Sequence, residues 1–102
     1  MKQMINGKQY DTDTAELLLT TDNGLSHSDF VWSEEELYKK RTGEFFIRGT
    51  GGAATAYGRS CGQNERCGGS RIIPLSLEKA KEFGEKNMDA DTYESVFGPV
   101  EE

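Results

Sequence analysis

The chain has 102 residues, of which 34% are hydrophobic and 29% charged, and its formal net charge is −6. This length and composition predict one α+β domain over residues 1–102 and argue against a chain that is disordered throughout. Apolar runs such as Leu17-Leu18-Leu19 are far shorter than the roughly 20 residues of a membrane-spanning helix. The N-terminal segment also lacks an apolar signal-peptide core, so we expect a soluble, cytoplasmic protein.

The first part of the chain predicts two short β elements. Asn6-Gly7 lies between two short apolar-bearing arms and suits a type I′ turn, because both central residues must accept positive φ. Residues 11–21 fit two patterns. Asp13 followed by Glu16 resembles a capping box, but the leucines that follow run into the turn residues Asp22-Asn23-Gly24. We favour a hairpin followed by a strand.

The centre of the chain predicts a β-hairpin. Residues 37–40 and 44–48 flank a short loop that ends in Gly43, and apolar and polar side chains partly alternate along both arms. Upstream, residues 33–36 fit either a strand or the cap and first turn of a helix, and residues 30–32 either begin the incoming strand or pack beneath it.

The second half predicts a long loop and then two helices. Residues 49–70 hold seven glycines, which predicts a loop with one helical turn at 53–57. Residues 71–75 follow as a short strand, which Pro74 restricts to a sheet edge or a strand end. Ser76 suits the N-cap of a helix over residues 77–87.

A last short helix is expected to begin at Asp89 or Asp91 and to stop at Gly98-Pro99, ahead of a frayed tail at 99–102. The predicted fold is therefore α+β, with an antiparallel β-sheet centred on the 37–48 hairpin and packed by the C-terminal helices.

Charge is unevenly distributed along the chain. Residues 37–71 hold seven basic and two acidic side chains, whereas residues 1–36 hold two and eight, and residues 72–102 three and eight. The basic hairpin either contacts a nucleic-acid backbone or an acidic partner, or is a solvated tip that discourages edge-to-edge association. The acidic flanks either occupy a basic groove built for nucleic acid or merely keep the chain soluble.

The glycines at 49–52 suggest a candidate anion site. They follow a predicted strand and precede the predicted helical turn, and backbone amides at such a junction can hold a phosphate or a carboxylate. The Walker pattern is absent, and Ala54 stands at the third position of a Gly-x-Gly-x-x-Gly motif. The simpler interpretation is a turn at the sheet edge.

The candidate binding residues from the basic hairpin, the glycine run and the acidic flank are Lys39, Lys40, Arg41, Arg48, Thr50, Gly51, Gly52, Tyr57, Arg59, Glu34, Glu35 and Glu36.

Cys61 and Cys67 are expected to be free thiols, because the expected compartment is reducing. A disulfide between them is the alternative. A metal site would need two more ligands, and the only histidine, His27, is remote in sequence. Ser26-His27-Ser28-Asp29 holds the residue types of a catalytic triad without its geometry. We expect no catalytic residue, no metal and no cofactor.

A resemblance covers nearly the whole chain. It is carried by Asn6-Gly7-Lys8, Tyr10-Asp11-Thr12, Ser28-Asp29-Phe30, Leu37-Tyr38, residues 43–46, Gly49 with Gly51-Gly52, and residues 72–76 with the capped helix that follows. This pattern resembles a widespread, largely uncharacterised group of small bacterial proteins of similar length, many of them carried by phages, plasmids and conjugative elements. Thr55-Ala56 stands where relatives have a serine-lysine pair, which weakens the idea of an anion site.

The resemblance implies a role against host defence, because such genes often counter it and small acidic anti-CRISPR proteins come from this group. We therefore expect a non-catalytic binding protein of a mobile genetic element that inhibits a host defence complex through a charged surface. The expected partner is a protein, such as a CRISPR effector complex, and no membrane is involved. The alternative is a nucleic-acid-binding accessory protein that uses the basic central hairpin.

Overall fold

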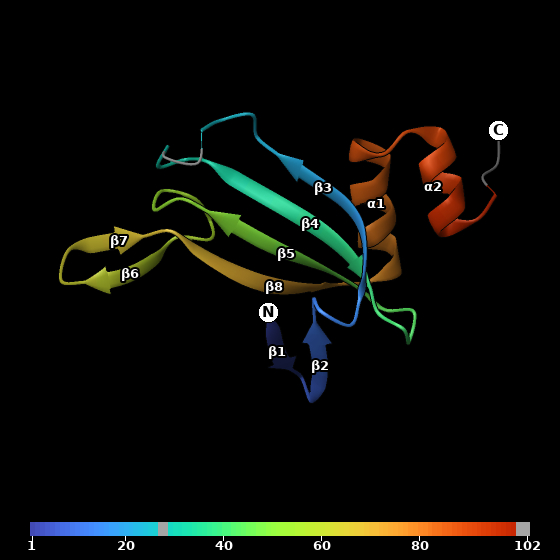
Figure 1. The fold of residues 1–102 in the computed structure, drawn as a ribbon, viewed down its shortest axis with the longest axis horizontal. Helices are drawn as coiled ribbons and strands as arrows, with labels where there is room; N and C mark the ends of the chain where they lie inside the picture. The colour runs from blue at the N-terminus through green and yellow to red at the C-terminus, as the bar shows by residue number, and fades with distance from the viewer. Residues whose placement is uncertain (27–28, 100–102) are drawn as a thin grey trace.

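A four-stranded antiparallel β-sheet forms the centre of the molecule (Figure 1). The structure is a computed structural model and describes residues 1–26 and 29–99. The elements are β1 (Lys2–Ile5), β2 (Lys8–Asp11), β3 (Glu16–Asp22), β4 (Ser33–Lys39), β5 (Phe45–Gly51), β6 (Arg59–Gly62), β7 (Glu65–Cys67), β8 (Gly69–Leu75), α1 (Leu77–Asn87) and α2 (Ala90–Phe97). The sheet order is β3-β4-β5-β8, while β1-β2 and β6-β7 form separate hairpins.

The N-terminal hairpin covers one face of the sheet. Its turn has Asn6 and Gly7 at φ values of 52° and 77°, as a type I′ turn requires, so the predicted hairpin is confirmed. Tyr10 from β2 packs with Tyr38, Phe46 and Ile72 in one buried cluster.

The two helices cover the opposite face. Leu37, Phe45 and Ile47 pack there against Ala80 of α1 in a second buried cluster. Because successive residues of a strand point to opposite faces, the run 45–47 supplies both clusters and is buried throughout. The predicted α+β fold, with C-terminal helices packed on a sheet centred on the 37–48 hairpin, is confirmed.

Local signals place the helices where the sequence predicts them. The Ser76 hydroxyl accepts a hydrogen bond from the Lys79 amide at 3.1 Å, and the Asp89 carboxylate accepts one from the Thr92 amide at 2.7 Å. Gly98 ends α2 with a φ of 91°. The tail expected at 99–102 lies, from residue 100 on, outside the described residues. In the part of the chain that the structure describes, neither helix is long and apolar enough to cross a membrane.

The prediction of a long loop over residues 49–70 is wrong. β5 continues to Gly51, residues 53–57 form turns rather than a helical turn, and β8 begins at Gly69. Residues 59–67, which we call the arm, form a hairpin of β6 and β7 with Asn64 at a φ of 59° in its turn. The radius of gyration is 15.0 Å, above the roughly 13 Å of a compact chain of this length, because the arm projects from the end opposite the helices (Figure 1).

Candidate functional site

The predicted basic residues lie at opposite ends of the sheet. Lys39 ends β4, with Lys40 and Arg41 in the turn that follows it, whereas Arg59 lies on the arm beyond the far end of β5. Arg48 lies between them, and its Nη1 atom is 2.7 Å from Glu36 Oε1. Of the predicted basic residues, Lys39, Lys40 and Arg41 therefore lie together, whereas Arg48 and Arg59 lie apart from them.

Two of the lysines near the β4–β5 turn also have local contacts. Lys40 Nζ is 3.6 Å from Glu44 Oε1 and 4.2 Å from the centre of the Tyr10 ring. Lys39 Nζ lies 5.8 Å from the centre of the Phe45 ring. These contacts give the basic turn a structural role in holding the N-terminal hairpin and the sheet together.

The predicted acidic residues of β4 point to both faces of the sheet, and the helical alternative for residues 33–36 is wrong because they are paired in the sheet. Glu36 accepts from Arg48 and lies 3.4 Å from the Tyr38 hydroxyl. Glu35 accepts from the Tyr57 hydroxyl on the other face. Glu34 lies opposite Asp22 in the ladder. No single acidic surface results from Glu34, Glu35 and Glu36.

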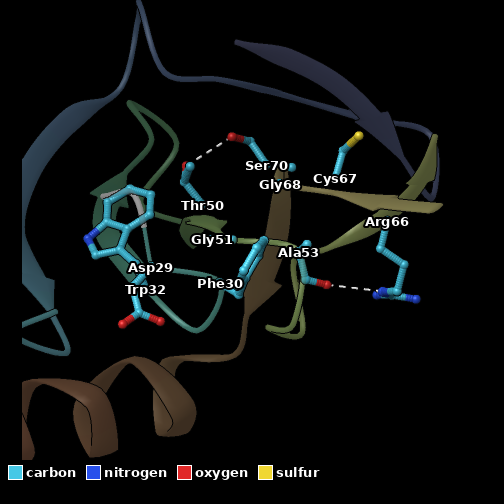
Figure 2. Close-up of a pocket in the computed structure, with 12 residues that line it drawn as sticks. Asp29, Phe30, Trp32, Thr50, Gly51, Ala53, Arg66, Cys67, Gly68 and Ser70 are labelled. Carbon is cyan, nitrogen blue, oxygen red and sulfur yellow. Dashed lines mark hydrogen bonds between the residues drawn. The ribbon is translucent and has the colours of Figure 1, made fainter. Parts of the chain in front are cut away.

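A groove of about 610 Å³ lies where the sheet meets the arm (Figure 2). It is lined by Asp29, Phe30, Trp32, residues 50–53 and residues 66–70. On its lining, the hydroxyls of Thr50 and Ser70, which are partners in the β5–β8 ladder, are hydrogen-bonded at 2.9 Å. Three predicted site residues, Thr50, Gly51 and Gly52, therefore line the same groove, and its volume is within the usual range for ligand sites.

Phe30 stands exposed at the edge of this groove on a fixed backbone. Its side chain is 73% exposed, whereas Trp32 is buried, so only Trp32 packs beneath the strand. The Phe30 carbonyl accepts from the Ala54 amide at 2.8 Å, and Asp29 Oδ1 accepts from the Val31 amide at 3.0 Å. An exposed aromatic ring on a hydrogen-bonded loop is prepared for binding at little entropic cost.

The two arginines of the arm are held in a similar way. Arg66 Nε donates to the Ala53 carbonyl at 3.0 Å, and Arg59 Nε donates to the Gly68 carbonyl at 3.4 Å. Among residues 1–26 and 29–99, neither guanidinium has a carboxylate within salt-bridge distance. In Figure 2, Arg66 and Trp32 lie on opposite sides of Phe30. Because neither guanidinium is paired with a carboxylate, the terminal nitrogens of Arg59 and Arg66 are available to an anionic partner.

Cys61 and Cys67 are joined by a disulfide across the arm, so the prediction of free thiols is wrong. The two sulfurs meet because β6 pairs antiparallel with β7. Both sulfurs are therefore occupied in the disulfide, and His27 and Ser28 lie outside the described residues. Among the residues with described positions, no group of three or more His, Cys, Asp or Glu side chains could hold a metal ion.

The glycines beside the groove allow close packing rather than anion binding. A Cβ atom at Gly52 would lie 2.6 Å from the Phe30 carbonyl oxygen, so only glycine lets the two loops approach. The Gly52 amide donates to the Trp32 carbonyl at 2.8 Å. This amide is therefore occupied within the protein. The simpler interpretation, a turn at the sheet edge, is wrong for Gly49 and Gly51, because both belong to β5, which pairs with β4 on one side and β8 on the other.

Tyr57 anchors the loop between β5 and the arm. Its ring lies against Gly49, where a Cβ atom would overlap it, and its hydroxyl donates to Glu35 at 3.2 Å. The Arg71 guanidinium is 5.6 Å from the ring centre. Burial, followed by the charge of Glu35 and the hydrogen bond to it, raises the pKa of Tyr57 to about 12.

We expect Tyr57 to ionise well above pH 10. The folded pKa is higher than that of a free tyrosine, so the stability that Tyr57 contributes is fully present below pH 10 and is lost as the pH rises through about 12. The difference in tyrosinate absorbance between wild type and Tyr57→Phe measures this transition. A difference centred near pH 10 would contradict the buried position of the hydroxyl.

Phe30 and Arg66 complete the groove, yet sequence reasoning did not select them. One signal was available: Cys61-Gly62-Gln63-Asn64-Glu65-Arg66-Cys67 has a two-residue turn centre between cysteines, which indicates a closed hairpin. No protein-family model, curated protein sequence or solved structure matches this chain.

Proposed function

We propose that the chain is a non-catalytic binding protein of a mobile genetic element that inhibits a host defence complex through a charged surface. Its sharper form is an anti-CRISPR protein that acts in the cytoplasm of the host bacterium on a CRISPR effector complex. The resemblance described above supports the biological setting, and the groove with its arm supports the binding surface.

The observation that carries this proposal is that Phe30 and Arg66 line one groove, with Arg59 on the adjoining arm. Aromatic and arginine side chains dominate the binding energy of protein interfaces. Here the ring is exposed and both guanidinium groups are anchored through Nε to backbone carbonyls. The partner surface is then an apolar pocket with carboxylates around it, because such a surface complements this end of the molecule.

A panel of purified CRISPR effector complexes, each with and without guide RNA, tests the proposal. We expect the immobilised protein to retain at least one effector. The variant Phe30→Ser, Arg66→Gln is expected to weaken that binding by about tenfold or more, since it removes the aromatic anchor and one anchored charge. Lys86→Gln is the matched control, because it removes an exposed charge from α1 at the other end of the molecule.

The effector panel and a salt titration together distinguish the proposed function from the nucleic-acid-binding alternative. Failure to retain any effector would remove the CRISPR form of the proposal. A salt titration of binding to duplex DNA and RNA addresses the nucleic-acid alternative, which requires binding that weakens steeply as salt increases. We expect no such binding, because Lys39, Lys40 and Arg41 lie at one end of the sheet and Arg59 at the other.

A further inference from the structure

The arm is a short, solvent-exposed hairpin closed by one covalent bond. β6 has four residues, all exposed, and β7 has three. An isolated two-stranded hairpin of this size is marginally stable in water, because it has too few contacts to offset its loss of conformational entropy. The Cys61–Cys67 disulfide restricts that entropy directly. The disulfide is therefore expected to contribute much of the order of the arm.

The same bond shapes the wall of the groove. Cys67 lines the groove, and its neighbour Arg66 reaches the Ala53 carbonyl across it. Opposite Cys67 in the ladder stands Arg59, whose Nε contacts Gly68, the residue after the disulfide. If β6 and β7 separate, both arginine anchors lose the backbone geometry on which they depend.

We propose that Cys61 and Cys67 form a redox switch: the oxidised pair builds the arginine wall of the groove, and the reduced pair releases it. This inference rests on the proposed function for its biological meaning, since the arm carries the assigned binding surface. In a reducing cytoplasm, protein disulfides are typically transient and redox-sensing, which fits a regulatory disulfide better than a permanent structural one.

The chemistry needs a dithiol reductant. One thiolate of the reductant attacks the sulfur of the exposed Cys61, which forms a mixed disulfide and releases Cys67 as a thiolate. The second thiol of the reductant then breaks the mixed disulfide. Two electrons pass to the protein, two protons end on Cys61 and Cys67, and the reductant is left as a disulfide. Arg59, which stands opposite Cys67 in the ladder, favours the departing thiolate electrostatically.

The switch is local because both buried clusters lie at the other end of the sheet. The clusters around Phe46 and Leu37 contain no residue of the arm. Reduction is therefore expected to loosen residues 59–67 and to leave the sheet and helices folded.

Amide hydrogen exchange of the free protein, oxidised and then treated with dithiothreitol, tests the switch. We expect exchange in residues 59–67 to accelerate by about tenfold or more on reduction, while amides of β4 and β5 keep their rates. The double variant Cys61→Ser, Cys67→Ser is expected to exchange like the reduced protein whether or not reductant is present. Alkylation of the thiols verifies each redox state.

Two outcomes would overturn the switch. Equal amide exchange of the arm in both states would show that the disulfide does not control the order of the arm. Loss of protection throughout the sheet on reduction would show that the disulfide stabilises the whole fold. Because only the free protein is used, the result is independent of the effector panel. An effector bound by a protein whose arm does not respond to reduction would keep the proposed function and remove the switch.

Discussion

Replacing Phe46 by alanine is expected to lower the free energy of unfolding by about 3–5 kcal/mol. Its side chain is 0% exposed, its ring stacks on Tyr38 with centroids 5.1 Å apart, and the edge of Tyr10 meets it at 5.5 Å. The substitution leaves a cavity at the point where the N-terminal hairpin joins the sheet, and it removes two aromatic contacts. Denaturant unfolding measures the loss.

The matched control is Met4→Ser in the same hairpin. Met4 is 65% exposed, so its replacement is expected to change the free energy of unfolding by less than about 0.5 kcal/mol. A domain of this size has about 5–15 kcal/mol of stability in total, which makes the Phe46 variant marginal. A loss below about 1 kcal/mol for Phe46→Ala would mean that the ring is not packed between the tyrosines.

Adding one methyl group at Gly49 is expected to cost about 1–3 kcal/mol of unfolding free energy. Gly49 is buried in β5, and the Tyr57 ring occupies the place that a side chain would take. Gly49→Ala must therefore displace the ring and break the hydrogen bond from its hydroxyl to Glu35. The loop that leads to the arm loses its anchor, and amide exchange over residues 52–58 is expected to rise with the fall in stability.

A double-mutant cycle isolates this contact. In a Tyr57→Ala background the space above Gly49 is free, so Gly49→Ala is expected to cost less than about 0.5 kcal/mol there. The difference between the two backgrounds, about 0.5–3 kcal/mol, is the coupling between the two residues. Equal costs in both backgrounds would show that Gly49 is required for another reason.

The elements that the sequence predicts correctly carry their signals locally. Asn6-Gly7 supplies its own turn geometry, and Ser76 supplies the cap of α1 from the residue before it. For residues 11–21, the choice of strand over helix also holds, because the leucines pair with β4 through a bulge. These outcomes depend on neighbours a few residues apart, which single-sequence reasoning can assess.

The error over residues 49–70 arises because glycine has two uses. In a loop it permits unusual backbone angles, whereas in β5 it makes room for another side chain. Only the folded chain shows that Tyr57 covers Gly49 and that the backbone at Phe30 covers Gly52. Glycine content alone therefore predicts a loop, although Gly49 and Gly51 belong to β5, Gly62 to β6 and Gly69 to β8.

The candidate site was only partly predictable for a similar reason. Thr50, Gly51 and Gly52 were selected and line the groove, but Lys39, Lys40 and Arg41 lie at the far end of the sheet. The order of charged residues along the chain does not determine where they lie on the surface, because antiparallel strands run between the two ends of the sheet. The sequence predicts that Phe30 begins the incoming strand or packs beneath it, whereas the structure exposes its ring beside a turn in which Asp29 accepts from the Val31 amide.

The contact between Gln3 and β8 has a consequence for how the chain is made. The Ile72 amide donates to Gln3 Oε1, which links residues 69 positions apart, and the hairpin packs on the cluster that Ile72 completes. During synthesis from the N-terminus, the β1-β2 hairpin is therefore made well before β8, the strand that completes its buried cluster. Folding of that layer therefore waits for the synthesis of β8. A nascent chain truncated before β8 is expected to expose Tyr10 and Phe46 to chaperones.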